Sequence, residues 1–537
     1  MNVAASAELD QWRERLQALG FDDDGLRLCG PIQWEHPDRG AVSARIEVVP
    51  DNRFPFAPPQ VRILETSTPL ELTFHIERAE KPGGNGHLCL WEDDWDVAVA
   101  PWRDPQQLLH RVAGWLENTA HGWPDDNACD LERYLPPDHG PLVLYDNDEL
   151  QNLKQVPVRV RDGQTTATVR VTAETRAGSM SDSRRRLARK DQHLAWVEDF
   201  GALEHPVRSW ADLENRLGTR AANIAAGISA GLIERLILRY RRGTQSSVLV
   251  VCARTSSDGE IAITACESAD VSGATRRMRA GRQAHALGDT KVAIVGCGAI
   301  GSFAADLLFR SGVHRLTLID GEVLRPGNVV RHLAGRDQVG LPKVKAVRVC
   351  LDAIDDTTKV RATRGSVRNL SDAIKLVCEH DVVVDATASA RASSVLATAA
   401  EIIGGVVVSV CVQREGDVVR MDRFPADEGE TYLPGLALID DGDLPWERGC
   451  GSPVSLTPPG AVVAAAELAC RVVIDEALSH RTYPASLAEI RRSQPEAPFD
   501  QVGWVEGQTE RQTVSAPPSK IHEGGNSSTI TPQQLPT

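Results

Sequence analysis

The stretch Lys-Val-Ala-Ile-Val-Gly-Cys-Gly-Ala-Ile-Gly, residues 291–301, decides how the second half of this 537-residue chain is expected to fold. An apolar run ends at residue 295, and Gly296, Gly298 and Gly301 follow it. Glycines at this spacing let backbone N–H groups approach a phosphate at the N-terminus of the next helix, where the helix dipole favours negative charge. The stretch therefore predicts a nucleotide-binding turn between a strand and a helix.

Apolar strands recur on the C-terminal side of this turn, at 316–319, 382–384 and 406–410. Helical segments separate them, so the pattern predicts a mostly parallel, Rossmann-like α/β sheet. Asp320 closes the strand at 316–319, at the distance expected for a carboxylate that binds ribose hydroxyls. On these residues alone, a nicotinamide (NAD) oxidoreductase competes with an ATP-dependent enzyme.

Polar residues downstream of the glycines separate the two alternatives. Asn328 and Arg331 form an Asn-x-x-Arg pattern, and Lys343 follows a proline. Both patterns resemble the ThiF, MoeB and ubiquitin-activating superfamily, and the resemblance implies that Asp320 binds ribose while the other three residues contact ATP. Cations near the departing pyrophosphate stabilise charge that develops during adenylation, whereas hydride transfer has no need of them. The patterns favour adenylation.

One position departs from that family. A second acid usually follows the strand-end aspartate and helps to hold Mg²⁺, but Ala388 stands at its place. Asp385, the acid at the end of the preceding strand, is the expected substitute because Mg²⁺ prefers oxygen ligands near phosphates.

A candidate catalytic cysteine lies further along. Cys450 stands in Arg-Gly-Cys-Gly-Ser-Pro, before an apolar helix-like stretch at 460–477. This order resembles the ThiF-type arrangement in which a thiolate takes the acyl group from the adenylate. A small buried side chain is the alternative for Cys450, and it describes Cys252, Cys297 and Cys470 better.

The first 135 residues predict a separate α+β domain with a helix, strands at 41–49 and 60–64, and a second helix from Asp104. The proline-rich run Phe-Pro-Phe-Ala-Pro-Pro-Gln-Val at 54–61 resembles a segment of ubiquitin-conjugating enzymes. His75, then Gly-His-Leu-Cys-Leu at 86–90, then Trp95 follow in the order of further landmarks of that family.

The resemblance implies that Cys89 receives an acyl group as a thioester and yields it to an amine. It is incomplete, because Ile76 and Glu77 follow His75 where the family carries an asparagine that is proposed to steady the oxyanion. Asn85 lies nearby in the sequence.

The remaining sequence carries weaker signals. Residues 136–285 predict a central α/β linker or scaffold domain, with a hairpin near 156–172 and a long helix at 221–240. The ThiF-type domain is expected at 286–485. A C-terminal extension follows at 486–537, where Ser, Thr, Pro, Gln and Gly predict disorder after about residue 505.

Composition limits the partners and the compartment. The net charge of −15 argues against nucleic acid or an anionic membrane as a partner. Eleven cysteines without a Cys-x-x-Cys pair favour a reducing cytoplasm. The start of the chain lacks a signal-peptide pattern, and no apolar run is long enough to span a bilayer.

The order of domains resembles fused conjugating–activating ligases of bacterial anti-phage systems that use cyclic-oligonucleotide signalling. This resemblance implies a cytoplasmic homodimer that uses ATP and Mg²⁺ to activate the C-terminus of a cGAS-like nucleotidyltransferase and to transfer it to an amine on an acceptor. A ligase for a bacterial ubiquitin-like protein is a second possibility. An NAD-binding oxidoreductase and a catalytically inert scaffold are alternatives of other classes.

Overall fold

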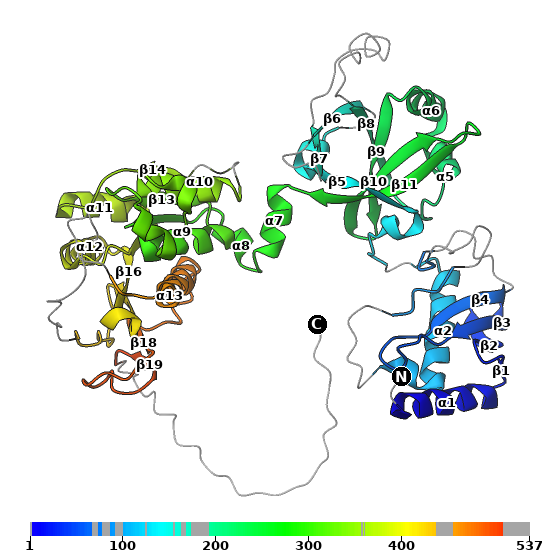
Figure 1. Ribbon diagram of the computed structural model, residues 1–537, viewed down its shortest axis with the longest axis horizontal. Coiled ribbons are helices and arrows are strands. Elements are labelled where there is room, and N and C mark those ends of the chain that lie inside the picture. The colour runs from blue at the N-terminus through cyan, green and yellow to red at the C-terminus, as the bar shows by residue number, and fades with distance from the viewer. Residues whose placement is uncertain are drawn as a thin grey trace, which may run out of the picture. The chain divides into compact units, whose positions relative to one another are not determined.

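The computed structural model separates the chain into two compact units, Met1–Thr275 and Arg276–Thr537 (Figure 1). The structure describes residues 3–66, 74–77, 86–91, 100–123, 126–153, 156–162, 168–172, 193–355, 358, 360–436 and 455–508.

Unit 1 begins with a helix, an antiparallel sheet and a second helix, which we call the N-terminal α+β domain. The sheet has the strand order β1-β2-β3-β4. The elements are α1 (Val3–Ala18), β1 (Asp22–Asp23), β2 (Leu28–His36), β3 (Gly40–Val49), β4 (Gln60–Thr66) and α2 (Pro105–Ala120). This arrangement confirms the α+β order that the sequence predicts.

Aromatic and aliphatic side chains from both helices and the sheet form the core of this domain. Trp12 and Leu16 of α1 pack with Ile46 of β3 and with Trp115 of α2, and all four are almost fully buried. Asp104 caps α2 as expected, since its side chain accepts a hydrogen bond from the backbone N–H of Gln106. The core fixes α2 against β2.

A closed seven-stranded barrel, the barrel domain, completes unit 1. Its strands are β5 (Pro137–Tyr145), β6 (Val156–Asp162), β7 (Thr168–Thr172), β8 (His193–Ala202), β9 (Ile233–Arg242), β10 (Gln245–Thr255) and β11 (Ile261–Asp270). One core cluster draws side chains from all seven strands, which identifies it as the barrel interior. Helices α5 (Trp210–Leu217) and α6 (Ala221–Ser229) contact the outside of β11.

The prediction of one long helix at 221–240 is wrong. The helix ends at Ser229, Gly231 turns the chain at a φ of +65°, and β9 follows at Ile233–Arg242. Leu236 and Ile237 then point to opposite sides of the barrel wall, because each belongs to a different core cluster. A strand that is buried on both sides reads as a continuous apolar run, which periodicity alone does not distinguish from a helix.

Unit 2 contains an eight-stranded sheet with the order β14-β13-β12-β15-β16-β17-β18-β19. The first five strands in this order are parallel and the last three antiparallel. The parallel strands are β12 (Lys291–Val295), β13 (Arg315–Ile319), β14 (Arg361–Thr363), β15 (Val382–Asp385) and β16 (Val406–Gln413). The predicted Rossmann-like sheet is thereby confirmed.

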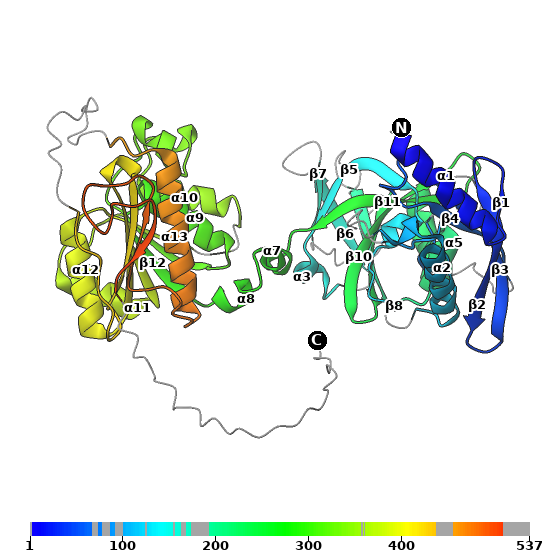
Figure 2. The ribbon, with the colours of Figure 1, turned by 90° about the horizontal axis from the view of Figure 1, so that it is seen from below.

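Helices cover both faces of this sheet (Figure 2). Val292 and Ile294 of β12 belong to one core cluster, while Ala293 and Val295 belong to another. The first cluster lies under α9 (Ala299–Arg310), α10 (Lys343–Asp352) and α13 (Pro459–Ala477), and the second under α11 (Leu370–Glu379) and α12 (Ala390–Ile403). Burial on both faces explains why these strands are apolar throughout.

The sheet extends beyond the boundary expected at residue 485. After β17 (Val418–Phe424), strands β18 (Ser486–Ile490) and β19 (Gly503–Glu506) continue the antiparallel edge. The prediction of an extension separate from the domain is therefore wrong for 486–508. Its short strands lie among polar residues and prolines, and β19 alternates between half-buried and exposed positions, so a composition argument misses them. Residues 509–537 lie outside the described part of the chain.

Among the described residues, no helix is long and apolar enough to cross a membrane.

Candidate functional site

A cavity of about 510 Å³ in unit 2 lies at the carboxyl ends of β12, β13 and β15. The strand order reverses there, with β13 on one side of β12 and β15 on the other. Ligands of open α/β sheets bind in the crevice at this kind of switch point. We call it the glycine-turn pocket, and its lining includes Gly296, Gly298, Asp320, Lys343, Arg368 and Arg391.

The predicted glycines form the turn from β12 into α9. Gly296 has a φ of +87°, and a Cβ there would lie 2.7 Å from the backbone oxygen of Ala386. A Cβ on Gly301 would lie 1.8 Å from the backbone oxygen of Gly296. Gly298 is the N-cap of α9. The glycines therefore allow close backbone packing around a helix N-terminus that suits a phosphate.

Two of the predicted polar residues face this pocket. Asp320 holds the glycine turn, because its Oδ2 accepts a hydrogen bond of 2.8 Å from the backbone N–H of Cys297. The ammonium of Lys343 pairs with Glu322 and lies 4.0 Å from where a Cβ on Gly298 would stand. A buried cation beside a helix N-terminus is suited to hold phosphate oxygens.

Asn328 and Arg331 lie in a short helical segment and do not line the pocket. The Asn328 side chain accepts a hydrogen bond from the backbone N–H of Arg325. Arg331 donates to Ser455 Oγ at 2.8 Å, in the segment that follows Cys450 in the sequence. The structure thus brings Asp320 and Lys343 together with the glycines but not these two residues.

Asp385 lies beneath the pocket and does not line it. It is 1% exposed, and Oδ1 accepts hydrogen bonds from the backbone N–H and the hydroxyl of Thr387. Oδ2 accepts from the hydroxyls of Ser393 and Ser409. Ala388 follows with a φ of +52°, a conformation that non-glycine residues seldom adopt. With both oxygens in use, Asp385 fits a role that shapes the 386–389 segment better than a role as a direct Mg²⁺ ligand.

Cys450 lies outside the described residues. Cys252, Cys297 and Cys470 are buried, which confirms the prediction that they are core side chains. Burial raises the pKa of the Cys470 thiol to about 11. A thiol that holds its proton at neutral pH is a poor nucleophile.

Backbone pairing in unit 1 sets Cys89 beside His75. The backbone N–H of Cys89 donates to His75 O at 2.7 Å, and Glu77 N–H donates to His87 O at 2.8 Å. A Cβ on Gly86 would lie 1.7 Å from Glu77 O, so only glycine permits this approach. The two landmarks, His75 and Gly86–Cys89, therefore meet across a local antiparallel pair.

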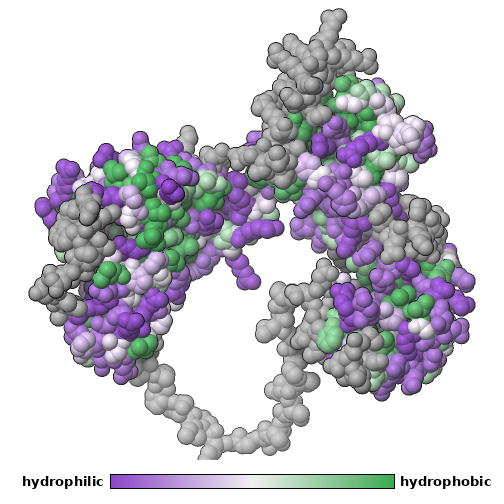
Figure 3. All heavy atoms as spheres, viewed as in Figure 1, coloured by the Kyte–Doolittle hydropathy of each residue, from purple (hydrophilic) through white to green (hydrophobic). Residues whose placement is uncertain are grey.

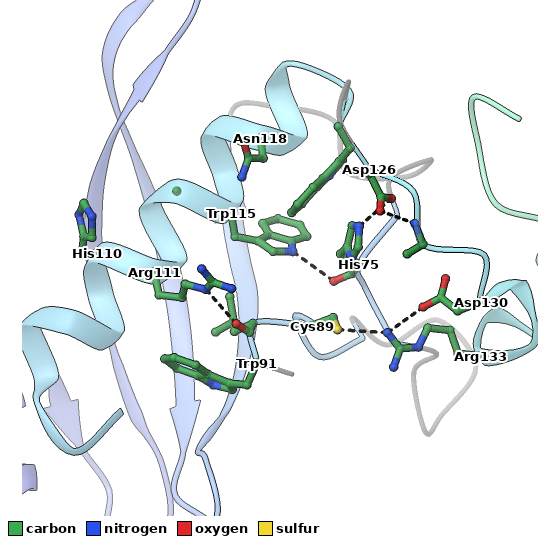
Figure 4. A pocket seen from close by; sticks show the side chains of 14 residues that line it. His75, Cys89, Trp91, His110, Arg111, Trp115, Asn118, Asp126, Asp130 and Arg133 are labelled. Carbon is green, nitrogen blue, oxygen red and sulfur yellow. Dashed lines mark hydrogen bonds and ion pairs between the residues drawn. The ribbon is translucent and has the colours of Figure 1, made fainter. Parts of the chain in front are cut away.

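Cys89 opens on a cavity of about 630 Å³, the Cys89 cavity (Figure 4). Arg133 donates a hydrogen bond from Nη1 to Cys89 Sγ at 3.1 Å. The same nitrogen lies 3.0 Å from Asp130 Oδ2. His75, Trp115, Trp123 and Asp126 also line the cavity. The half-buried sulfur is thus accessible and has a cation beside it.

His75 adopts a φ of +61° and is held from several sides. Trp115 Nε1 donates to its backbone oxygen, and its backbone N–H donates to the Tyr134 hydroxyl. Its ring lies 4.1 Å from that of Trp123, and its Nε2 is 2.9 Å from Asp126 Oδ2. A strained backbone persists only where its surroundings fix it, and such residues cluster at functional sites.

Hydrogen bonds set the charge of His75. Burial alone would lower the pKa of this imidazole, but its bonds with Asp126 and Cys89 raise the pKa from 6.5 to about 9. Burial would raise the pKa of Asp126, yet the bonds from His75, Ala128 and Arg242 hold it well below its usual value. At neutral pH the pair is therefore imidazolium and carboxylate.

The barrel domain contributes to this site. Arg242, at the end of β9, pairs with the same Oδ2 of Asp126 that faces His75. Its guanidinium lies 3.4 Å from the centroid of the Phe74 ring, and Phe74 packs in a core cluster with barrel residues. Sequence reasoning missed Asp126, Arg133 and Arg242, and the sequence offers no motif that marks them. Asn85 and Trp95 lie outside the described residues.

Residues 275–435 match the model of the ThiF family, and this match begins where unit 2 begins. Unit 2 therefore holds a ThiF-type domain with a Rossmann-like sheet.

Similar proteins include y4oA of Sinorhizobium fredii, 40% identical over 138 residues, which cover 22% of this chain and 23% of that protein. Molybdopterin-synthase adenylyltransferase of Escherichia coli is 34% identical over 103 residues, 19% of this chain and 41% of that protein. The ATP-dependent ubiquitin transferase-like protein Cap2 of Vibrio cholerae is 28% identical over 198 residues, 33% of each. The chain spans less than half the length of each of these relatives.

Proposed function

We propose that this chain activates the C-terminal carboxylate of a partner protein with ATP and transfers the acyl group, through cysteine thioesters, to an amine. The observation that carries the proposal is that one chain combines the glycine-turn pocket with a cysteine that faces a cavity beside a histidine and an arginine. The pocket supplies phosphate contacts, and the cysteine supplies an acyl acceptor. Neither an oxidoreductase nor a scaffold needs both.

In the first step, the partner carboxylate attacks the α-phosphate of ATP and pyrophosphate leaves. We assign the phosphate oxygens to the N–H groups at the start of α9 and to the ammonium of Lys343, which lies close to Gly298. We assign the ribose hydroxyls to Asp320, which lines the pocket. Mg²⁺ would neutralise phosphate charge when bound. Arg331 remains a candidate for a contact that forms only in the loaded enzyme.

In the following steps, the adenylate passes its acyl group to Cys450 and then to Cys89, with loss of AMP at the first transfer. An amine on an acceptor then attacks the Cys89 thioester. Sequence resemblance supports Cys450, whereas for Cys89 the cavity adds support because its sulfur is accessible and lies beside Arg133.

The proposed partner is the C-terminus of a cGAS-like nucleotidyltransferase in anti-phage defence, with a bacterial ubiquitin-like protein as the second candidate. The similarity to Cap2, whose name describes a ubiquitin transferase-like protein, supports this class of substrate.

We further propose a homodimer built on unit 2. Apolar residues gather on the side of unit 2 that carries α9 and α10 (Figure 3). Leu341, just before α10, and Val349, within α10, are large apolar side chains that stay exposed. Exposed apolar patches mark association surfaces.

Pyrophosphate exchange into ATP tests the first step. The full chain should catalyse exchange that depends on a nucleotidyltransferase with an intact C-terminus, and deletion of the last residues of that partner should abolish it. A mass measurement in solution tests the dimer. Tight NAD binding with no ATP binding would contradict adenylation.

A thiol-sensitive adduct with the partner tests the transfer steps. Cys450→Ala should block loading of both cysteines, because the adenylate loses its first acceptor. Cys89→Ala should still load Cys450 but yield no amide conjugate. Intact mass and non-reducing gels separate these species. Normal loading of Cys89 in Cys450→Ala would show direct transfer from the adenylate.

A further inference from the structure

We propose that His75 is the proton acceptor for acyl transfer at Cys89, oriented by Asp126 and by Arg242 of the barrel domain, with Arg133 as the cation that stabilises the departing sulfur. This inference rests on the proposed function, in which Cys89 carries a thioester. It also gives the central region of the chain a part in the chemistry.

The first support is the order of contacts from the cysteine outward. His75 Nε2 is 2.9 Å from Asp126 Oδ2, which leaves Nδ1 as the ring nitrogen that takes the proton in this proposal. The backbone N–H of Cys89 donates to His75 O at 2.7 Å, and the proximity of Cys89 contributes to the raised pKa of the imidazole. Figure 4 shows His75 between Cys89 and Asp126, with its contact to Asp126 dashed, which is the order that a nucleophile, a base and an orienting acid require. A histidine that served only as a core side chain would not need a strained φ beside an accessible sulfur.

The second support is that Asp126 is itself fixed. Arg242 is 5% exposed at its side chain and reaches both Asp126 and the backbone oxygen of Leu203. Arg242 is therefore a buried cation that binds Asp126, and it holds this carboxylate in place and balances its charge. Because Arg242 ends β9, the rigid barrel wall positions His75 through Asp126.

The third support is the charge balance of the transfer step. The amine nitrogen forms a bond to the thioester carbonyl carbon, the carbon–sulfur bond breaks, and the proton of the amine moves to His75 Nδ1. The sulfur leaves as a thiolate 3.1 Å from Arg133 Nη1. The products at the site are thiolate and imidazolium, a pair that Arg133 and Asp126 stabilise on either side.

Acylation prepares His75 for this role. The bond from Cys89 is one of the causes of the raised His75 pKa, and a thioester removes the negative sulfur. The bond with Asp126, the larger of the raising causes, remains, so His75 accepts a proton in its deprotonated fraction, which acylation and rising pH both increase. Among the described residues, the other ionisable groups at this end of the cavity include Asp126, Cys129, Asp130, Arg133, Tyr134 and Arg242.

A partner-free assay on the full chain tests the proposal. p-Nitrophenyl acetate acetylates Cys89, with Cys89→Ala as the blank, and added glycinamide accepts the acetyl group. His75→Gln should slow transfer to glycinamide by at least about 10²-fold. His75→Gly should show the same loss, because glycine tolerates the positive φ, and added imidazole should restore much of the rate.

Asp126→Asn and Arg242→Leu should each slow transfer by about tenfold or more, because they misorient the imidazole. His121→Gln is the matched control, since this exposed histidine at the end of α2 does not line the cavity, and it should transfer at the wild-type rate. Wild-type transfer by His75→Gln, or a loss in His75→Gly that imidazole fails to restore, would overturn the proposal. The assay uses no ATP, so absence of pyrophosphate exchange would remove the proposed function without touching this result.

Discussion

The glycine-turn pocket and the Cys89 cavity are assembled in different ways. The pocket takes its main residues from the ends of adjacent parallel strands and the turn that follows β12. The cavity takes His75 and Cys89 from one local strand pair, Arg133 from a later segment and support from Arg242 in another domain. A site built along one sheet is encoded by a contiguous motif, whereas a site built between domains is encoded by scattered residues.

The largest expected effect concerns the glycine-turn pocket. Lys343→Ala removes the buried ammonium beside the start of α9 and should lower partner-dependent pyrophosphate exchange by about 10²–10³-fold. Acetyl transfer at Cys89 should not change. Lys345→Ala, an exposed lysine on the same helix, is the matched control and should retain exchange. Equal loss in both variants would show that Lys343 acts only through general charge.

A pair of glycine substitutions tests whether the two sites fail separately. Gly301→Ala places a Cβ 1.8 Å from Gly296 O, and Gly86→Ala places one 1.7 Å from Glu77 O. A shift of about 1 Å at a reacting group costs about 10²-fold in rate. Gly301→Ala should therefore reduce exchange alone and Gly86→Ala acetyl transfer alone. Loss of both activities in either variant would break the separation. Gly460→Ala, whose Cβ meets open space at the start of α13 and lines neither cavity, controls for the substitution.

The smallest expected effect concerns Asp385. Because both of its oxygens accept hydrogen bonds from Thr387, Ser393 and Ser409, Asp385→Asn should loosen the 386–389 segment and lower exchange by roughly tenfold. The Mg²⁺ concentration that gives half-maximal exchange should stay the same. A large increase in that concentration would instead identify Asp385 as the metal-holding acid that the sequence predicts.

Sequence patterns predicted the Rossmann-like half well. Strands that are buried on both faces give long apolar runs, and a turn that must admit phosphate leaves glycines at fixed spacing, so Gly296 to Gly301, Asp320 and Lys343 were found together. The roles of these residues remain predictions. Asn328 and Arg331 stand apart from the pocket in the structure, and motif order does not reveal such distances.

Of the residues at the Cys89 cavity, the sequence predicted only His75 and Cys89. Local pairing places His75 beside Cys89, and both carry a family landmark. Asp126 and Arg242 are separated by 116 positions in the chain, and most of β9, the strand that Arg242 ends, falls within the helix expected at 221–240. Long-range pairs of this kind depend on tertiary packing, which propensity and spacing do not encode.

The bond between Arg242 and Asp126 also predicts how related sequences should differ from this one. If the barrel holds the imidazole of His75 in place, Asp126 and Arg242 should be substituted together as related sequences diverge. Chains that lack the barrel should also lack an acid at the position of Asp126. Recombination that joins the N-terminal α+β domain of another protein to this barrel would then separate Arg242 from the acid that matches it. The functional module subject to selection would be residues 1–275 as a whole, and its boundary would lie where the ThiF-type domain begins.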